Sequence, residues 1–354
     1  MKNKKILTIL LVLIILLTSG CGAKDYIHDK DGKMVTNNKT GQTLQSQIFC
    51  KPSNGTDVYK LYEEYSDQMV IPLDELPECS NFKIKYTKTD GIWSFIFVKP
   101  IAWLILRLGN LLKAAGLKKA FLGVSLIIIG VLIRLIMLPL NIKTQNQSKN
   151  IQKLQPEIAR IERKYAGRND QEAMIAKSQE TMLLYRKYKI NPLLSCVLAL
   201  IQLPLFFAFL QAIYKIPTIY EGSIFGWNLG TTPSVGFANH HYSYIILVIL
   251  IIATTFFSFK MTMNQTASTN TDAQQQTKVM LIVMTVFIGF ASLSLPTAIA
   301  LYWISTYAVV IAQTYIMKAI SNRGNDTNRS LKEETKRIRE KLKIKEGMKY
   351  GKDN

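Results

Sequence analysis

The chain has 354 residues and carries 44 Lys and Arg against 24 Asp and Glu, a net charge of +20. Yet 48% of its residues are hydrophobic, and the mean hydropathy is +0.12. These figures exclude a single soluble basic domain and a disordered basic tail, because neither combines so much apolar mass with this charge. Apolar spans in a bilayer, with the charge outside them, explain both figures.

The first 21 residues have the pattern of a secretory signal. Lysines are followed by an apolar run from Ile6 to Leu17, which is too short to cross a bilayer comfortably. The run ends Leu17-Thr18-Ser19-Gly20-Cys21, which resembles a bacterial lipoprotein signal apart from Thr18, where Leu is usual. We therefore expect lipidation of Cys21, by acyl chains such as palmitate. Ordinary signal cleavage and an uncleaved anchor are the alternatives.

Residues 22–90 differ in composition from the rest of the chain. They are polar, with 9 Lys against 11 Asp and Glu, and would be exported behind the signal as a small extracytoplasmic segment. The segment contains two thiols, Cys50 and Cys79, and an oxidising exterior would permit a disulfide between them. Two unpaired thiols are the alternative. The segment contains no catalytic motif.

Residues 93–119 are basic and amphipathic. Leucines and Trp103 alternate with Arg107 and several lysines, and no acidic residue occurs from Lys99 to Lys119. This pattern predicts a helix that lies in the membrane interface, with its basic side chains reaching toward the headgroups. A sixth transmembrane span is the alternative, which the internal Arg107 disfavours.

Five apolar segments follow that are candidates for transmembrane helices: 121–140, 193–214, 242–259, 279–295 and 297–317. Most of them are long enough for a hydrocarbon core of about 30 Å, whereas the fourth, at about 25 Å, is marginal. The segments outside them are predicted to be an extracytoplasmic loop at 215–241, a cytoplasmic loop at 260–278 and a basic cytoplasmic tail at 318–354.

The distribution of charge predicts the orientation. The loop 141–192 holds 11 Lys and Arg and the segment 318–352 holds 12, whereas the loop 215–241 holds Lys215 alone. The positive-inside rule therefore places 141–192 and the tail in the cytoplasm. Five spans then put the N-terminal segment outside, in agreement with the signal. We expect a multi-pass protein of the bacterial cell membrane.

The loop 141–192 is itself predicted to be helical. Ile151, Leu154, Ile158, Ile161 and Tyr165 form an apolar seam at helical spacing, which residues 166–170 interrupt. Asp170 is a suitable N-cap for a second helix. These features predict an antiparallel helical hairpin. It is either a docking or gating element or a self-packed connector.

Arg134 is the one charge well inside a predicted span, and the five spans contain no Asp or Glu. It lies about 9 Å from the cytoplasmic end, where a charge costs about 2.5–3.5 kcal/mol on insertion scales. The guanidinium either reaches the headgroups or faces a wet cavity. Side chains that could line such a cavity are Gln202, Trp303, Ser305, Thr306, Tyr307 and Gln313. Without a resident counter-ion, Arg134 would attract an anion from outside the protein.

Catalytic and metal-binding patterns are missing from the sequence. It has no phosphate-binding G-x-x-x-x-G-K-[ST] loop, no H-E-x-x-H, and no acidic pair or Ser–Lys or Ser–His pair within a span. The three His and four Cys are scattered, which argues against a zinc cluster or a redox dithiol. We expect a non-enzymatic protein with no catalytic residue, no metal and no cofactor.

Several short motifs occur in order between Trp93 and Met317. They are Arg134 to Leu140, Leu154-Gln155-Pro156-Glu157, Lys189 to Cys196, Ile201-Gln202-Leu203-Pro204, Phe257 to Met261, Leu295-Pro296-Thr297 and Leu301-Tyr302-Trp303. Together they resemble the YidC-type (YidC/Oxa/Alb) membrane protein insertases, in the short form with a lipoprotein-like signal found in Gram-positive-type bacteria. The sequence departs from the residues common in this family at four positions: Phe259 stands in place of Gln, Thr285 of Pro, Ala298 of Gly and Tyr307 of Asn.

The resemblance implies an all-α polytopic fold, in which five core helices enclose a hydrophilic groove open to the cytoplasm and to lipid. An interfacial helix and a cytoplasmic hairpin complete this fold. The groove would contain Arg134, Gln202, Trp303 and Thr306. The implied function is to insert and help fold new membrane proteins, with lipoproteins as a second class of substrate, alone or with the Sec translocon.

The implied partners are nascent membrane proteins and membrane lipids, with no small-molecule substrate. Tails of this kind are implicated in docking ribosomes, and rRNA phosphate is a suitable ligand for 12 basic residues. Anionic headgroups are the alternative ligand for the tail. A small-solute transporter or channel is the alternative function, although the sequence shows no inverted repeat.

Overall fold

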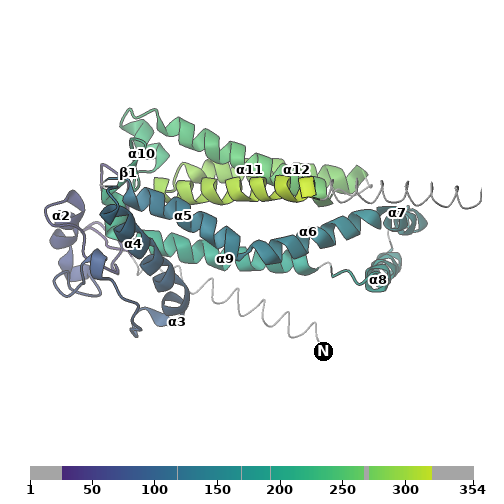
Figure 1. Ribbon diagram of the computed structural model, residues 1–354, viewed down its shortest axis with the longest axis horizontal. Coiled ribbons are helices and arrows are strands. Elements are labelled where there is room, and N and C mark those ends of the chain that lie inside the picture. Colours follow the sequence, from purple (N-terminus) through teal and green to yellow (C-terminus); the bar gives the residue numbers. More distant parts are fainter. Residues whose placement is uncertain (1–25, 118, 169, 192, 267–270, 321–354) are drawn as a thin grey trace, which may run out of the picture. The chain divides into compact units, whose positions relative to one another are not determined.

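The computed structural model describes residues 26–117, 119–168, 170–191, 193–266 and 271–320. The chain divides into two units, Met1–Ala308 and Val309–Asn354. The described part of the first unit is mostly helical, apart from residues 26–56 and 69–90, which consist largely of bridges and turns (Figure 1). The predicted signal with Cys21 and nearly all of the basic tail lie outside the described residues.

The helices and strands follow one another in this order along the chain. They are α2 (Asp57–Glu64), η2 (Ser66–Gln68), η3 (Cys79–Asn81), α3 (Gly91–Trp93), the π-helix η4 (Ser94–Val98), α4 (Lys99–Ala114), α5 (Phe121–Ile136), α6 (Leu138–Lys153), α7 (Gln155–Lys164), α8 (Gln171–Lys187), α9 (Leu193–Tyr214), η5 (Pro217–Glu221), β1 (Ser223–Ile224), β2 (Trp227–Asn228), α10 (Pro233–Ala238), α11 (Tyr244–Thr266), α12 (Thr271–Ser292) and the helix Thr297–Ile320.

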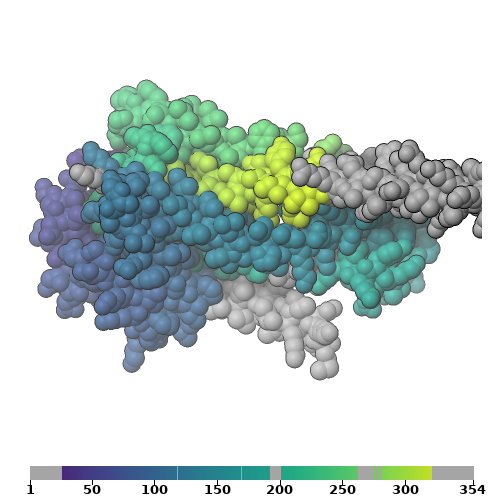
Figure 2. Space-filling model, viewed as in Figure 1, coloured from purple at the N-terminus to yellow at the C-terminus, as the bar shows by residue number. Residues whose placement is uncertain are grey.

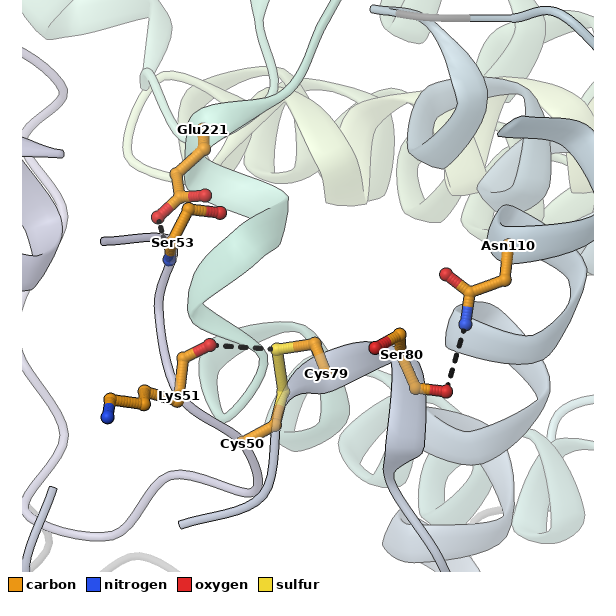
Figure 3. Close-up of a disulfide and its surroundings, with 7 residues drawn as sticks. All are labelled: Cys50, Lys51, Ser53, Cys79, Ser80, Asn110 and Glu221. Atoms are coloured by element: carbon orange, nitrogen blue, oxygen red, sulfur yellow. Dashed lines mark hydrogen bonds between the residues drawn. A yellow bond between two sulfur atoms is a disulfide. The ribbon is translucent and has the colours of Figure 1, made fainter. Parts of the chain in front are cut away.

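Residues 26–90 form a small folded segment that contacts α4 and η5 and shares a buried apolar cluster with the helices (Figure 2). Isolated antiparallel bridges join Tyr26 to Gln45 and Thr36 to Thr43. The Tyr62 side chain is fully buried in the segment, and this burial raises the pKa of its hydroxyl. Cys50 and Cys79 are joined by a disulfide, as the sequence permits (Figure 3).

The next two long helices, α4 and α5, pack closely against each other. Gly109 of α4 lies against the side chain of Leu122, where a Cβ would approach within 3.0 Å. The buried hydroxyl of Ser125 donates a hydrogen bond of 2.8 Å to the carbonyl of Ile105. A small residue and a hydrogen bond between the two helices therefore accompany this close approach, as in other membrane helix pairs.

The first predicted span, 121–140, is not one straight helix. Helix α5 ends at Ile136, and α6 begins at Leu138 at an angle of 54° to it. Pro139 at the start of α6 explains the break, because its ring clashes with the carbonyl four residues earlier and it has no N–H to donate. The last residues of the predicted span therefore belong to a second helix that continues to Lys153.

The predicted helical hairpin is formed by α7 and α8, but its first seam is divided. The sequence suggested one helix through Ile151 and Tyr165, whereas the structure breaks it at Leu154 because Pro156 starts α7. Leu154, Ile158 and Ile190 form a small apolar cluster. The side chain of Asp170 caps α8 by accepting from Ala173 N at 3.0 Å, as predicted.

Ionic and hydrogen-bonded contacts show that α7 and α8 run antiparallel. Lys164 Nζ lies 2.9 Å from Glu180 Oε2, and Tyr188 donates a hydrogen bond of 2.6 Å to Glu157. The ion pair raises the pKa of Lys164 and lowers that of Glu180. In Figure 1 the hairpin and the segment 26–90 lie at opposite ends of the first unit.

The residues between α9 and α11 close over the end of the bundle at which the segment 26–90 lies. The β1–β2 hairpin places Ile224 against Gly123 of α5, where a Cβ would come within 2.9 Å. The hydroxyl of Thr297 donates a hydrogen bond of 2.8 Å to the carbonyl of Thr231. This loop is therefore fixed to both α5 and the last helix.

Three helices within the described residues are long and apolar enough to cross a membrane: Gly91–Ala114, Tyr244–Met261 and Thr297–Ile320. The bent pair α5 and α6 is a fourth if it counts as one span, and Ile201–Tyr214 and Leu281–Ser292 are shorter apolar helices. The range Gly91–Ala114 includes the helix predicted to lie in the interface. The count of five spans and the interfacial position remain predictions.

Gly130 permits a close contact between α5 and the last helix. A Cβ at this position would lie 2.2 Å from Ser305 Oγ, but 3.4 Å from Ser305 Cβ. We predict that Gly130→Ala destabilises the protein by about 1–3 kcal/mol, because the added methyl overpacks the contact. Removing the hydroxyl in Gly130→Ala/Ser305→Ala should restore most of the loss.

Chemical denaturation of the purified protein in detergent would measure both variants, with Ser305→Ala alone as the control. A double variant as unstable as Gly130→Ala would show that the contact with Ser305 is not the cause.

Candidate functional site

Arg134 lies in the last turn of α5, immediately before the break that Pro139 produces. The sequence placed it six residues inside a continuous span, whereas the structure places it at the end of a helix. The carbonyl groups in the last turn of a helix have no partners within the helix and favour a nearby cation. The position therefore offsets part of the cost of holding a charge among apolar residues.

Two tyrosines of the last helix lie near the Arg134 guanidinium. Tyr302 and Tyr307 are both within electrostatic reach of its charge. Gly130, one turn before Arg134, would place a Cβ 3.4 Å from the Tyr302 ring, which shows how closely the helices approach here. Arg134 Nε is buried without a hydrogen-bond partner, and within the described residues no carboxylate forms an ion pair with this side chain.

Gln202 of α9 joins the same group. Its side chain lies close enough to the Tyr302 hydroxyl to interact with it, although the geometry falls short of a hydrogen bond. Phe209, two turns further along α9, stacks on the Tyr302 ring with centroids 3.8 Å apart. The structure therefore brings Arg134 and Gln202 together through Tyr302.

The other two predicted groove residues have different surroundings. Trp303 is half-buried and stacks on Phe206 of α9, with ring centroids 5.5 Å apart. Thr306 is buried, and its hydroxyl donates a hydrogen bond of 2.8 Å to the carbonyl of Trp303. Trp303 thus packs between helices, and the Thr306 hydroxyl already has a partner in its own helix.

Buried polar residues continue along α6 after the break. Asn141, Thr144 and Ser148 lie on one face of the helix, and each is less than a tenth exposed. Helix α6 contacts α9 and α11, so this polar face lies within the bundle. Nearby helices contribute Thr255 and Thr285, whose buried hydroxyls make no hydrogen bond among the described residues. The interior is therefore polar beyond the end of α5.

Tyr307 also contacts α11. Its ring lies 6.2 Å from that of Phe259, in a tilted arrangement. Phe259 and Tyr307 are two of the positions at which the sequence departs from the residues common in the family that it resembles. In the sequence, these two differences are far apart and look unrelated. The structure shows that they form one aromatic pair beside Arg134. The pair makes this part of the interior less polar than Gln and Asn would.

Apolar side chains surround the site on the outside of the bundle. Leu132, Leu135 and Ile136 of α5 and Ile201 and Leu203 of α9 are all at least 39% exposed. Exposed apolar surface around a half-buried cation is typical of a site that faces lipid. A cavity of about 790 Å³ lies elsewhere, near Asp57, Glu221 and His241.

Sequence reasoning missed the role of Tyr302. It grouped the polar residues of the last span by composition, without knowing which of them face α5. The small residue Gly130, four positions before Arg134, was the available signal, because a glycine at this spacing marks the helix face that a neighbour approaches. The described residues contain no group of His, Cys, Asp and Glu suited to a metal.

Comparison with known proteins places the chain in a family. The family model described as "60Kd inner membrane protein" matches residues 116–326. A membrane protein insertase YidC of Oceanobacillus iheyensis is 34% identical over 234 residues, which cover 65% of this chain and 84% of that protein. The membrane protein insertase MisCA of Bacillus subtilis is 34% identical over 244 residues, which cover 69% of this chain and 86% of that protein.

A solved structure, an active YidC insertase with its first transmembrane domain resolved, matches with a TM-score of 0.45 and 24% identity. The match covers 73% of this chain and about half (51%) of that chain. Residues 26–90 lie outside the range that the family model matches. From the family model and the curated relatives, the chain belongs to the 60Kd inner membrane protein family, the family of the YidC-type membrane protein insertases.

Proposed function

We propose that this protein inserts newly made membrane proteins into the bacterial cell membrane and helps them fold. Its family membership and its apolar helices support this function. The observation that carries the mechanism is Arg134, a half-buried cation beside Tyr302, whose Nε is buried without a hydrogen-bond partner and to which no carboxylate is paired within the described residues. Such a cation is suited to a ligand that supplies the missing negative or polar group.

The ligand would be the polar or acidic terminal segment of a nascent chain. Arg134 would attract this segment into the bundle, and the polar face of α6 would solvate it on the cytoplasmic side of the break. Burial of the substrate's own apolar helix in lipid supplies the driving force, at about 25 cal/mol per Å². This mechanism requires no nucleotide, cofactor or catalytic residue, and we propose that the protein is not an enzyme.

The orientation and the processing of the chain are part of the proposal. Residues 22–90 would lie outside the cell, as a lipoprotein segment attached through Cys21, and the α7–α8 hairpin and the tail would lie in the cytoplasm. We call the end of the bundle that contacts residues 26–90 the outer end. The net charges of +6 on 141–192 and +7 on 318–352 support this orientation.

The alternative function, a small-solute transporter or channel, would use the same polar interior. The family membership disfavours it, because the similar curated proteins are named as insertases. Cooperation with the Sec translocon and docking of ribosomes on the tail remain proposals, and the charge of the tail supports the second of them.

We predict that Arg134→Glu slows insertion of a substrate with an acidic terminal segment about tenfold or more. A charge-assisted hydrogen bond is worth about 1.5–3 kcal/mol, and every 1.4 kcal/mol is a factor of about ten. Arg134→Lys should retain part of the activity. Insertion into proteoliposomes, followed by protease protection, would measure these rates for several substrates.

Lys143→Glu is the matched control, because it makes the same charge change on α6 at an exposed position. Insertion of the acidic substrate by Arg134→Glu at the native rate would exclude attraction by Arg134. A loss that is equal for neutral and acidic substrates would indicate a structural defect instead.

The aromatic pair predicts a second effect. In Phe259→Gln/Tyr307→Asn the interior beside Arg134 becomes more polar, so substrates with longer charged terminal segments should insert several-fold faster. Substrates with short neutral segments should be unaffected. Phe257→Gln, on the exposed face of α11, is the control for a glutamine on this helix. If Phe259→Gln/Tyr307→Asn and Phe257→Gln change the insertion rates of all substrates equally, the aromatic pair does not select substrates by the charge of their terminal segments.

Removal of residues 321–354 should weaken binding of ribosomes to the protein in detergent and make it less dependent on salt, because fewer phosphate contacts remain. Sedimentation with ribosomes at several salt concentrations would measure this, and sedimentation with anionic vesicles would test the alternative ligand. Unchanged ribosome binding after truncation would exclude the tail as the docking element.

A further inference from the structure

Residues 26–90 share one hydrophobic core with the membrane helices. Ile48 and Phe49 of the segment belong to the same buried cluster as Ile105 of α4, Leu126 of α5 and Ile213 of α9. All five side chains are at most 5% exposed. The segment is therefore not tethered loosely outside the bundle but completes the packing of its outer end.

A buried polar network joins the segment to Lys99 of α4 and to Lys215, which directly follows α9. Asp90 forms an ion pair with Lys99, and their side chains are 3% and 6% exposed. The Gln47 amide donates to Asp90 Oδ1 at 2.6 Å and accepts from Lys215 Nζ at 3.0 Å. Lys99 Nζ also donates to the carbonyl of Lys85 at 2.5 Å. The segment thus supplies the counter-charge and the acceptors for both cations.

Phe49 lies between the two lysines. The ammonium of Lys99 is 5.8 Å from the centre of its ring, and that of Lys215 is 5.6 Å from the same ring. Cations attracted to an aromatic face gain most when they are shielded from water. If the segment left this position, Lys99 would lose the Asp90 carboxylate and Lys215 would lose its contact with Gln47, and breaking a buried ion pair is costly.

The disulfide joins two parts of the segment that contact different elements of the bundle, η5 and α4 (Figure 3). Beyond Cys50, Ser53 N donates to Glu221 at 2.9 Å, and the Thr56 hydroxyl donates to the same carboxylate oxygen at 3.0 Å. Next to Cys79, the carbonyl of Ser80 accepts from Asn110 of α4 at 3.2 Å. The bond therefore lies between one anchor on the loop after α9 and another on α4.

We propose that residues 26–90 form a cap, fastened by the Cys50–Cys79 disulfide and by Asp90, that closes the outer end of the bundle to water and ions. This role rests on the proposed function, because a polar interior that opens toward the cytoplasm requires a barrier at its other end. The cap belongs to this chain in addition to the family core, since the family model begins at residue 116.

Ion leakage through sealed proteoliposomes would test the cap. Asp90→Asn removes the counter-charge of Lys99 at nearly constant shape, and Asp67→Asn is the matched control at an exposed position of the same segment. We expect Asp90→Asn to raise the leak of protons or chloride several-fold, and Asp67→Asn to leave it at the wild-type value.

Reduction of the folded protein is the second measurement, because it does not require a variant to fold. Dithiothreitol would convert the disulfide to two thiols, with its own oxidation to a cyclic disulfide, and should raise the leak of the wild type. Cys50→Ser/Cys79→Ser should leak without reductant and respond no further to it, which controls for effects at other cysteines.

A rise in leakage with Asp90→Asn or with reduction supports the cap as the barrier, and no rise with either overturns it. The same vesicles can be tested for insertion of a membrane protein. Failure of the wild type to insert any substrate would overturn the proposed function, whereas normal insertion with an unchanged leak would overturn the cap alone.

Discussion

Placing the Arg134 guanidinium among apolar side chains costs free energy, and the structure around the end of α5 reduces this cost. Arg134 occurs where α5 ends, so that the negative end of the helix dipole favours its charge, and Pro139 produces that end. After the break, α6 continues with Asn141, Thr144 and Ser148 on its buried face. Helix end, bend and polar face together form an environment in which an unpaired cation can persist. A straight α5 would have left Arg134 in mid-helix, with none of this support.

At the outer end of the bundle, in contrast to Arg134, the buried lysines have hydrogen-bond partners. Lys99 forms an ion pair with Asp90, Lys215 donates a hydrogen bond to Gln47, and both ammonium groups lie near the Phe49 ring. These partner residues lie outside the range that the family model matches. A satisfied charge is bound to its partner, whereas an unsatisfied one remains available for a passing ligand. In the roles that we propose, a sheltered cation would thus serve closure at one end and recruitment of a substrate at the other.

The sequence predicted the helical class and the cap of α8 at Asp170, because periodicity and capping are local signals. It did not predict the breaks at Met137 and Leu154, although Pro139 and Pro156 were visible, because apolar runs were extended across them. It also could not pair Phe259 with Tyr307 or Gln202 with Tyr302. Such pairs depend on how each helix is rotated and packed against its neighbours. Local patterns in a single sequence do not reveal these contacts.

The contact between Gln47 and Lys215 joins residues 168 positions apart. In the proposed orientation the segment that carries Gln47 is made and exported early, but Lys215 arrives only after α9 has been synthesised and has entered the membrane. During this interval the segment lacks half of its partners, and its two thiols remain on the outer side with no surface to pack against. In this orientation the maturation of the protein would be ordered in time, because residues 26–90 could complete their folding only after the membrane helices of the same chain have been assembled.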